Sequence, residues 1–266
     1  MRNARSLSEN GEDATYHLKS LHHVLDVLEF LRETDAPSSV TEIAKATTLV
    51  KSGAYRILHN LERRGYVHKD DQSRYSLGVK LWQLGNALTS ISSLQACARP
   101  ILIGVTSVTN ETTHLAVLDR AYSLYIDKVE SVGPIRAYAE IGEYAPAHAV
   151  ATGKVLLASL PDYELRALPH EPFEGYTANG MPNFMALQDE LARIRQQGFA
   201  INDGSWRHEV VGVAVPARIH DRCTVALGAA GPRYRFSVDR ALSYVPLLQE
   251  KAQELENRFH QPGSTV

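Results

Sequence analysis

The spacing of apolar residues in the first third of the chain predicts helices followed by a hairpin. Apolar residues recur every three or four positions in three segments, as in helices with one buried face. These segments are 20–32, 39–46 and 51–64. In the first, the residues expected to face inward are Leu21, Val24, Leu25, Leu28 and Leu31. Two short extended runs around a polar turn follow, at 66–69 and 74–77, and predict a β-hairpin. This order of elements is that of a winged helix-turn-helix.

The rest of the chain predicts an α+β domain. A helical pattern covers 78–110, and Pro100 is expected to divide it. Its first part, 79–95, is expected to be a linker and dimerisation helix. Beyond it, alternation with a period of two predicts strands. The expected strands are 112–118, 123–129, 135–141, 199–203, 211–219 and 224–230, and the expected helices are 150–160, 184–197 and 237–259. Strands around a few helices favour a ligand-binding domain. The segment Ser39–Glu42 matches a capping box at the start of the second helix.

The helix over 51–64 has two different faces. Its apolar stripe consists of Ala54, Ile57, Leu58 and Leu61. The opposite face carries hydrogen-bond donors and cations without a carboxylate, and consists of Ser52, Tyr55, Arg56, His59 and Arg63. Gly53 lies in the first turn, where glycine costs about 1 kcal/mol of helix stability relative to alanine. Close approach of the backbone to another surface would explain it.

Composition narrows the class of protein. The chain has 266 residues, which is enough for two domains. Its two cysteines have no metal-like spacing, and so few cysteines favour a location in the reducing cytoplasm. The polar start is not a signal peptide, and no apolar run approaches the length of about 20 residues that a membrane helix needs. Although the net charge is −2, residues 45–69 carry six basic residues and one acidic residue. This patch favours a polyanionic partner, and a solvated helix face is the alternative.

Motifs for catalysis are missing from the sequence. The stretch ATGKV lacks the glycine and the Ser or Thr of a P-loop, because His148 and Val155 stand at those positions. No G-x-S-x-G occurs, and the histidines have no HxH or HExxH spacing. We therefore expect no catalytic residues, no cofactor and no metal, with a metal site assembled from dispersed histidines as the alternative for the metal. The start of the helix at Ala151, Thr152 and Gly153 remains as a position whose amides and dipole favour an anion.

Seven segments in a constant order resemble the IclR family of bacterial transcription regulators. They are TEIAKATTLVKSGAYRILHNLERRGYV, RYSLGVKLWQLG, HLAVLD, IDKVES, APAHAVATGKVLLASLP, GFAIND and VGVAVPAR. The resemblance implies a winged helix-turn-helix joined by a helix to a GAF-like effector domain. It also implies a homodimer or homotetramer that binds a palindromic operator on double-stranded DNA and responds to a small organic metabolite. The expected divisions are a flexible tail over 1–17, the DNA-binding domain over 18–78, the linker helix over 79–95 and the effector domain over 96–262.

Residues for DNA binding follow from the helix order. The helix over 51–64 is expected to enter a major groove. Ser52, Tyr55 and Arg56 are expected to contact bases or adjacent phosphates, with Gly53 allowing close approach. Phosphate contacts are expected from Thr41, Lys51, His59, Arg63, Lys69, Ser73 and Arg74. Family members commonly have proline at the position of Val50 and Ser or Thr at that of Gly53, so the operator is expected to differ.

Residues for effector binding are implied by the resemblance. They are Ala151, Thr152, Asn202, Gly212, Gly228 and Ala230. Family members that bind small acids often have Cys, Ser, Ser and Asp at the positions of Gly212, Gly228, Ala230 and Asn202. The residues present here remove donors and are expected to make room for an aromatic or longer-chain carboxylate.

Further candidates to line such a pocket are Arg136, Tyr138 and Trp206, with ordinary core packing as the alternative for the aromatic residues. We therefore expect a cytoplasmic regulator of catabolic genes. The alternative is a GAF-like enzyme or a protein-docking sensor, in which the winged helix binds protein.

Overall fold

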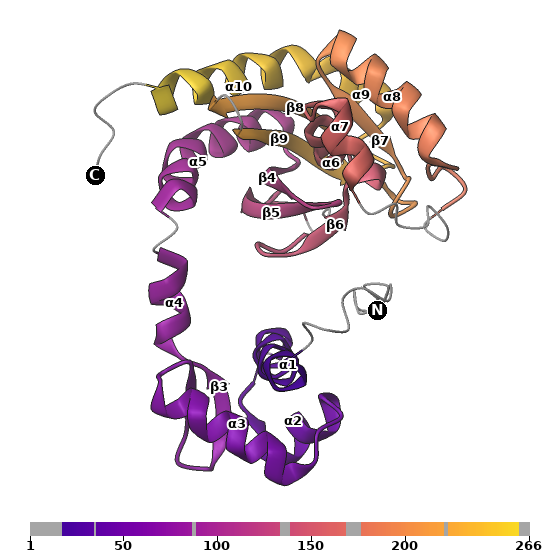
Figure 1. Ribbon diagram of the computed structural model, residues 1–266. Coiled ribbons are helices and arrows are strands. Elements are labelled where there is room, and N and C mark those ends of the chain that lie inside the picture. Colours follow the sequence, from indigo (N-terminus) through magenta and orange to yellow (C-terminus); the bar gives the residue numbers. More distant parts are fainter. Residues whose placement is uncertain are drawn as a thin grey trace. The chain divides into compact units, whose positions relative to one another are not determined.

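The computed structural model describes residues 18–34, 36–86, 89–133, 139–168, 177–220 and 223–260. The chain forms two compact units, divided in sequence between Thr89 and Ser90. Figure 1 shows the helical first unit and the sheet-containing second unit. Each unit has its own hydrophobic core.

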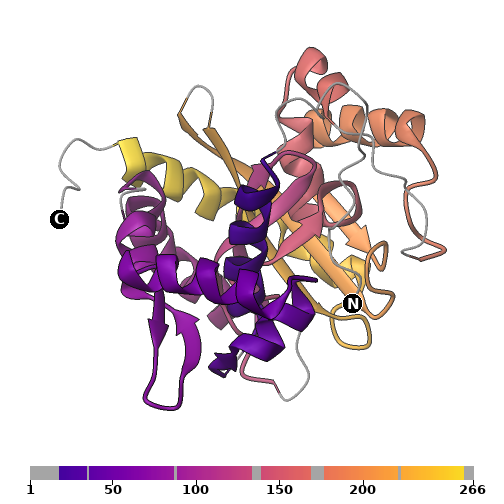
Figure 2. The same cartoon turned by 60° about the horizontal axis from the view of Figure 1, so that its bottom comes forward.

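The first unit is a winged helix-turn-helix, as predicted. Its sheet has the order β1-β3-β2, and β2 and β3 form the hairpin of the wing (Figure 2). The pattern did not predict β1, which has two residues and exists because it pairs with β3. The elements are α1 (Lys19–Glu33), β1 (Ser38–Ser39), α2 (Val40–Ala46), α3 (Lys51–Arg63), β2 (Val67–Lys69), β3 (Arg74–Leu77) and α4 (Val79–Asn86).

The start of α2 has the predicted capping box. Ser39 Oγ accepts a hydrogen bond from Glu42 N at 3.3 Å, and Glu42 Oε2 accepts one from Ser39 N at 2.7 Å. Arg74 on β3 adds a second connection, because its Nε donates to Pro37 O at 2.7 Å and its Nη2 lies 3.4 Å from Glu42 Oε2. The wing is therefore attached to the segment that leads into α2.

The buried face of α1 differs from the prediction. Val27 and Leu31 are buried, whereas Leu21 and Leu25 are 52% and 46% exposed. The residues of α1 that pack in the core of the first unit, against α2, α3 and β3, include Val24, Val27, Leu28 and Leu31. Leu21 and Leu25 are not part of this core.

Pro100 does not divide the long helical segment, so this prediction was wrong. It lies inside α5 (Thr89–Thr109), on an exposed side. Ala98, Ile101 and Leu102 around it are buried in the same core, which holds the helix together across the proline. Loss of one backbone donor at a solvent-facing position is tolerated when the buried stripe is continuous.

One segment of α5 contradicts the expectation that no apolar run is long enough for a membrane helix. Within the described ranges, Ile91–Thr109 is long and apolar enough to cross a membrane by length and composition, with 33% of it buried. Core helices of globular domains pass the same test. Leu94, Leu102 and Val105 of this segment pack in the core of the second unit.

The second unit is built on a six-stranded antiparallel sheet with the order β6-β5-β4-β9-β8-β7. This confirms the α+β class. β6 was not predicted, and most of the expected strand over 135–141 falls on residues 134–138, outside the described ranges, while 139–141 are not in a strand. The strands are β4 (Thr112–Asp119), β5 (Tyr122–Val129), β6 (Tyr144–Pro146), β7 (Ala200–Asp203), β8 (Val210–His220) and β9 (Cys223–Pro232).

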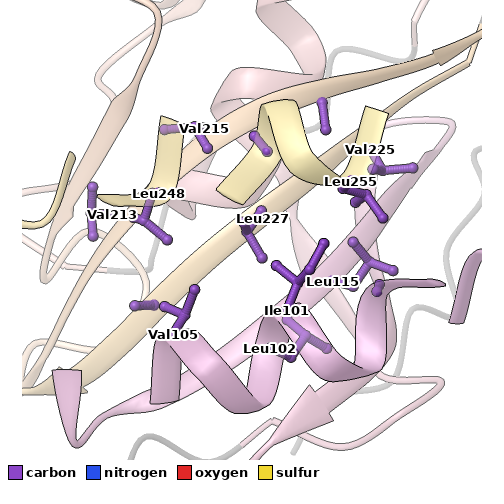
Figure 3. Close-up of a cluster of buried hydrophobic side chains, with 14 of the residues drawn as sticks. Ile101, Leu102, Val105, Leu115, Val213, Val215, Val225, Leu227, Leu248 and Leu255 are labelled. Carbon is purple, nitrogen blue, oxygen red and sulfur yellow. The ribbon is translucent and has the colours of Figure 1, made fainter. Parts of the chain in front are cut away.

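Helices cover both faces of this sheet (Figure 1). The expected helix over 237–259 is two helices, separated at Tyr244. On one face lie α5, α9 (Val238–Ser243) and α10 (Val245–His260); on the other lie the 3-10 turn η2 (Ala147–Ala149), α6 (Ala151–Ala158), α7 (Asp162–Ala167) and α8 (Phe184–Gln197). Figure 3 shows side chains of α5 and α10 meeting those of the strands in the first of these layers.

Side-chain size alternates along the central strands. Val213, Val215 and Leu227 point into the core under α5 and α10, whereas Ala214 and Ala226 pack in the core with α6. Small residues on the second face allow α6 to lie close to the sheet. The start of α6 is thereby placed directly over β8 and β9.

Candidate functional site

The predicted two faces of α3 are confirmed by burial. Ala54, Leu58 and Leu61 are buried. The opposite face is exposed and consists of Lys51, Ser52, Tyr55, Arg56, His59 and Arg63. The rings of Tyr55 and His59 stack with centroids 6.2 Å apart. This face therefore presents an aromatic pair flanked by cations.

Gly53 is not required by the fold of the first unit. A Cβ at this position would meet only Val50 Cγ2, at 3.4 Å. An alanine would fit and would favour the helix. The glycine therefore needs an explanation outside the packing of the domain.

The remaining predicted DNA contacts lie on α2 and the wing. Thr41 and Ser73 are exposed, and Ser73 adopts a φ of 59° in the hairpin turn. Lys69 Nζ lies 5.8 Å from the centroid of the Tyr75 ring. Arg74 differs from these residues, because its guanidinium already has the two partners within the domain, Pro37 and Glu42.

A cavity of about 50 Å³ lies in the second unit, where the start of α6 covers the sheet. The structure brings seven of the predicted effector-binding residues together in its wall. They are Ala151, Thr152, Asn202, Trp206, Gly212, Gly228 and Ala230. Strand register explains this grouping, because Gly212 pairs with both Asn202 and Ala230 across β7, β8 and β9.

Three predicted residues are not in this wall. Gly153 packs against η2 instead: a Cβ there would lie 2.3 Å from Ala147 Cα. Its role is close packing of α6, not ligand contact. Arg136 and Tyr138 lie outside the described residues.

Sequence reasoning missed about half of the wall. These residues are His114, Tyr125, Ala139, Val150, Arg207, Val210, Val213 and Ala229. His114 comes from β4, which lies beside β9, and Tyr125 comes from β5, which lies beside β4. The alternation along β4 places His114 on the same face as Ala116, but it does not reveal which strand lies opposite.

The inner wall carries a chain of neutral hydroxyl groups. Ser123 Oγ lies 3.0 Å from Thr152 Oγ1, and Thr152 lines the pocket together with Tyr125. Burial raises the pKa of Tyr125 to about 12, so the phenol keeps its proton. Asn202 Oδ1 accepts a hydrogen bond from Ser205 N at 2.8 Å, which shapes the segment after β7.

His114 is neutral in this environment. Burial, followed by the charge of Lys128, lowers the pKa of His114 to about 4. Its ring lies 5.0 Å from that of Tyr125, measured between centroids. Among the described residues, its Nε2 has no hydrogen-bond partner.

The described lining of the pocket carries one formal charge, which is ion-paired. Of the described side chains that line it, Arg207 is the one with a formal charge at neutral pH. Its guanidinium lies 4.4 Å from the Trp206 ring centroid, and its Nη2 lies 3.2 Å from Glu143 Oε1. No side chain caps the start of α6, so its amides add partial positive charge.

Lys154, the cation of the ATGKV stretch, does not line the pocket. Its side chain is buried between α6, β7 and α8. There its Nζ donates to Ile201 O at 3.1 Å and lies 3.7 Å from Glu190 Oε1. Burial lowers the pKa of Lys154. Within the described ranges, no three His, Cys, Asp or Glu residues are grouped so that they could hold a metal ion.

A winged helix with a cationic exposed face and an α+β unit with a pocket define a class of protein. This class is the transcription regulator that carries a DNA-binding domain and a ligand-binding domain in one chain. Family models agree with both assignments. The IclR helix-turn-helix domain matches residues 20–71, and the bacterial transcriptional regulator IclR C-terminal domain matches residues 86–257. The chain belongs to the IclR family of DNA-binding transcriptional regulators, whose members are regulators and not enzymes.

Individual relatives cover most of the chain. It is 33% identical to the HTH-type transcriptional regulator XynR of Escherichia coli over 79% of this chain and 84% of that protein. The crystal structure of Thermotoga maritima IclR is 28% identical with a TM-score of 0.74, over 92% of this chain and all of that one. An IclR homolog from Microbacterium hydrocarbonoxydans, complexed with 4-hydroxybenzoate, is 24% identical with a TM-score of 0.77, over 90% of this chain and 98% of that one.

Proposed function

We propose that this protein controls catabolic genes from the cytoplasm in response to a small organic carboxylate, aromatic or longer-chain. The observation that carries the proposal is the set of positively polarised groups that line the pocket. Arg207, which pairs with Glu143 at its outer side, and the uncapped start of α6 contribute positive charge, and no carboxylate lies among the described lining residues. An anion is therefore favoured. The Microbacterium protein, bound to 4-hydroxybenzoate, indicates that this fold can hold an aromatic acid.

The size of the effector depends on two glycines that behave differently. At Gly212 an added Cβ would be 3.7 Å from its nearest neighbours, so this glycine leaves usable space. At Gly228 an added Cβ would be 2.9 Å from Thr152 Cγ2, so the expectation of extra room was wrong there. That glycine allows α6 to approach the sheet.

Entry of an aromatic acid needs a change in the pocket. A cavity of about 50 Å³ has room for a few water molecules. Trp206 and Arg207, on the segment between β7 and β8, are partly exposed and are the lining side chains best placed to move. We infer that they shift when the effector binds.

We also propose the DNA-binding face. Ser52, Tyr55 and Arg56 would contact bases, with Gly53 allowing close approach. Phosphate contacts would come from Thr41, Lys51, His59, Arg63, Lys69 and Ser73. Arg74 would act mainly by holding the wing, since its guanidinium has internal partners.

A homodimer or homotetramer on a palindromic operator is supported by exposed apolar residues of the first unit. On α1, Leu21 and Leu25 are 52% and 46% exposed, and on α4, Val79 and Trp82 are 70% and 67% exposed. Light scattering coupled to size exclusion should give at least twice the monomer mass. Replacement of Trp82 by Glu should lower that mass.

The test is binding to DNA from upstream of the protein's own gene, measured by fluorescence anisotropy beside a scrambled duplex. Specific binding should be at least about 10³-fold tighter than binding to the scrambled duplex and should weaken with salt. Addition of aromatic and short-chain acids should then change the affinity for the operator. Equal weak binding to both duplexes would contradict a regulator of its own gene and would favour a protein-docking winged helix.

A further inference from the structure

His114 occupies an unusual position in the pocket wall. It lies on β4, directly opposite Gly228 of β9 and Lys128 of β5. Its exposed fraction is 4%, and its Nε2 has no hydrogen-bond partner among the residues that the structure describes. A buried polar atom without a partner destabilises a fold. A ligand that enters the pocket can supply the missing partner.

The groups around His114 are hydroxyl groups and one cation, Lys128, which is its register partner on β5. Tyr125 and Thr152, which carry hydroxyl groups, also line the pocket, and both residues are 6% exposed. Lys128, the cation opposite, is already paired with Glu130 and Glu140, each at 2.8 Å. The side chain of Arg207 is 40% exposed. The charge of Lys128 is therefore balanced within the fold, and Arg207, paired with Glu143 at 3.2 Å, lies toward solvent.

A neutral imidazole favours a neutral ligand group. Burial and the nearby charge of Lys128 hold the imidazole of His114 in its uncharged form. A carboxylate placed against it would bury a charge beside a neutral group. A hydroxyl group can either donate or accept, so it satisfies Nε2 in either tautomer of the ring.

We propose that His114 is a specificity-determining residue of this pocket, and that the effector is a hydroxylated carboxylic acid whose hydroxyl group hydrogen-bonds to Nε2 of His114. The acidic group then lies toward Arg207. This inference rests on the proposed function, because it assumes that the pocket takes an organic acid.

Titration calorimetry of the full chain with matched acids tests the proposal. The pairs differ by one hydroxyl group: 4-hydroxybenzoate and benzoate, 3-hydroxybenzoate and benzoate, 3-hydroxybutyrate and butyrate, and glycolate and acetate. In at least one pair, the hydroxylated acid should bind about tenfold tighter or more. His114→Leu should abolish this preference and leave the affinity for the plain acid unchanged or higher. His114→Gln, which can still hydrogen-bond, should keep part of it.

His148→Gln is the matched control. His148 is also buried, and its pKa is also lowered to about 4, but it does not line the pocket. This variant should keep the preference. Since His114→Leu removes an unpaired polar atom, it should remain folded, which circular dichroism would verify.

Several outcomes would overturn the assignment. Equal affinities within every pair, or a preference that survives His114→Leu, would exclude His114 as the hydroxyl partner and leave the carboxylate function intact. Uptake of nearly one proton on binding, seen by repeating the titrations in buffers of different ionisation enthalpy, would show that the carboxylate itself meets the histidine. Failure of every acid to bind would contradict both this proposal and the proposed function.

Discussion

His114 couples the stability of the second unit to pH. Its pKa in the folded state is lowered from 6.5 to about 4, so the unfolded chain binds the proton more tightly. The free energy of unfolding is therefore highest above pH 6.5, and it declines as the pH falls toward 4. Between pH 7 and 5 this residue alone should remove about 2 kcal/mol from the free energy of unfolding.

Urea unfolding at both pH values checks this expectation. In a Trp82→Phe background, Trp206 is the remaining tryptophan and reports on the second unit. His114→Gln should reduce the loss of stability between pH 7 and 5. Parallel losses in the parent and the variant would show that His114 titrates normally.

Replacement of Gly53 should have opposite effects on the stability of the first unit and on its affinity for DNA. Gly53→Ala should stabilise the first unit by up to about 1 kcal/mol, because a Cβ fits there and alanine favours helix. If the glycine allows close approach to DNA, the same variant should weaken operator binding. Thermal unfolding and anisotropy measure the two effects, and unchanged operator affinity would remove the proposed reason for this residue.

The packing of α6 against η2 requires Gly153. A Cβ at this position would be 2.3 Å from Ala147 Cα and O, both backbone atoms that cannot move alone. Gly153→Ala should destabilise the second unit by about 1–3 kcal/mol or more. Gly212→Ala is the control, since its Cβ would have ordinary contacts. Similar urea midpoints for the two variants would contradict this account.

Secondary elements were predictable where a local pattern decides them. The capping box of α2 and the stripe of α3 involve residues at most seven positions apart, and both were confirmed. The course of α5 through Pro100 and the existence of β1 were not predictable in this way. Each depends on a partner far along the chain: the core around Ala98 and Ile101, and strand β3.

The cationic face of α3 should determine the salt dependence of the intact regulator. Lys51→Ala should weaken binding to operator and scrambled DNA alike and lower the slope of log affinity against log salt by about 1 per bound protomer. Arg56→Ala should instead reduce the ratio between operator and scrambled DNA. If both variants have the same effect on both duplexes, the separation of phosphate and base contacts on this helix is wrong.

Coupling between the two units has a simple thermodynamic limit. An effector can change operator affinity only by its preference for one arrangement of the protein over another. By linkage, operator DNA must change effector affinity by the same factor. Titration calorimetry of the effector, with and without operator DNA, would measure this factor.

The amino-acid sequence alone determined the family, the order of the two domains and the two faces of α3, because periodicity, capping and motif order are local properties. It also indicated seven residues of the pocket wall, through the resemblance. Only the tertiary structure placed His114 and Tyr125 beside them, since strand order β5-β4-β9-β8 is a long-range property. The tertiary structure also showed that the glycines have different roles: Gly212 leaves space, whereas Gly153 and Gly228 are needed for packing. That difference depends on how closely α6 approaches its neighbours, and no pattern along the chain encodes that distance.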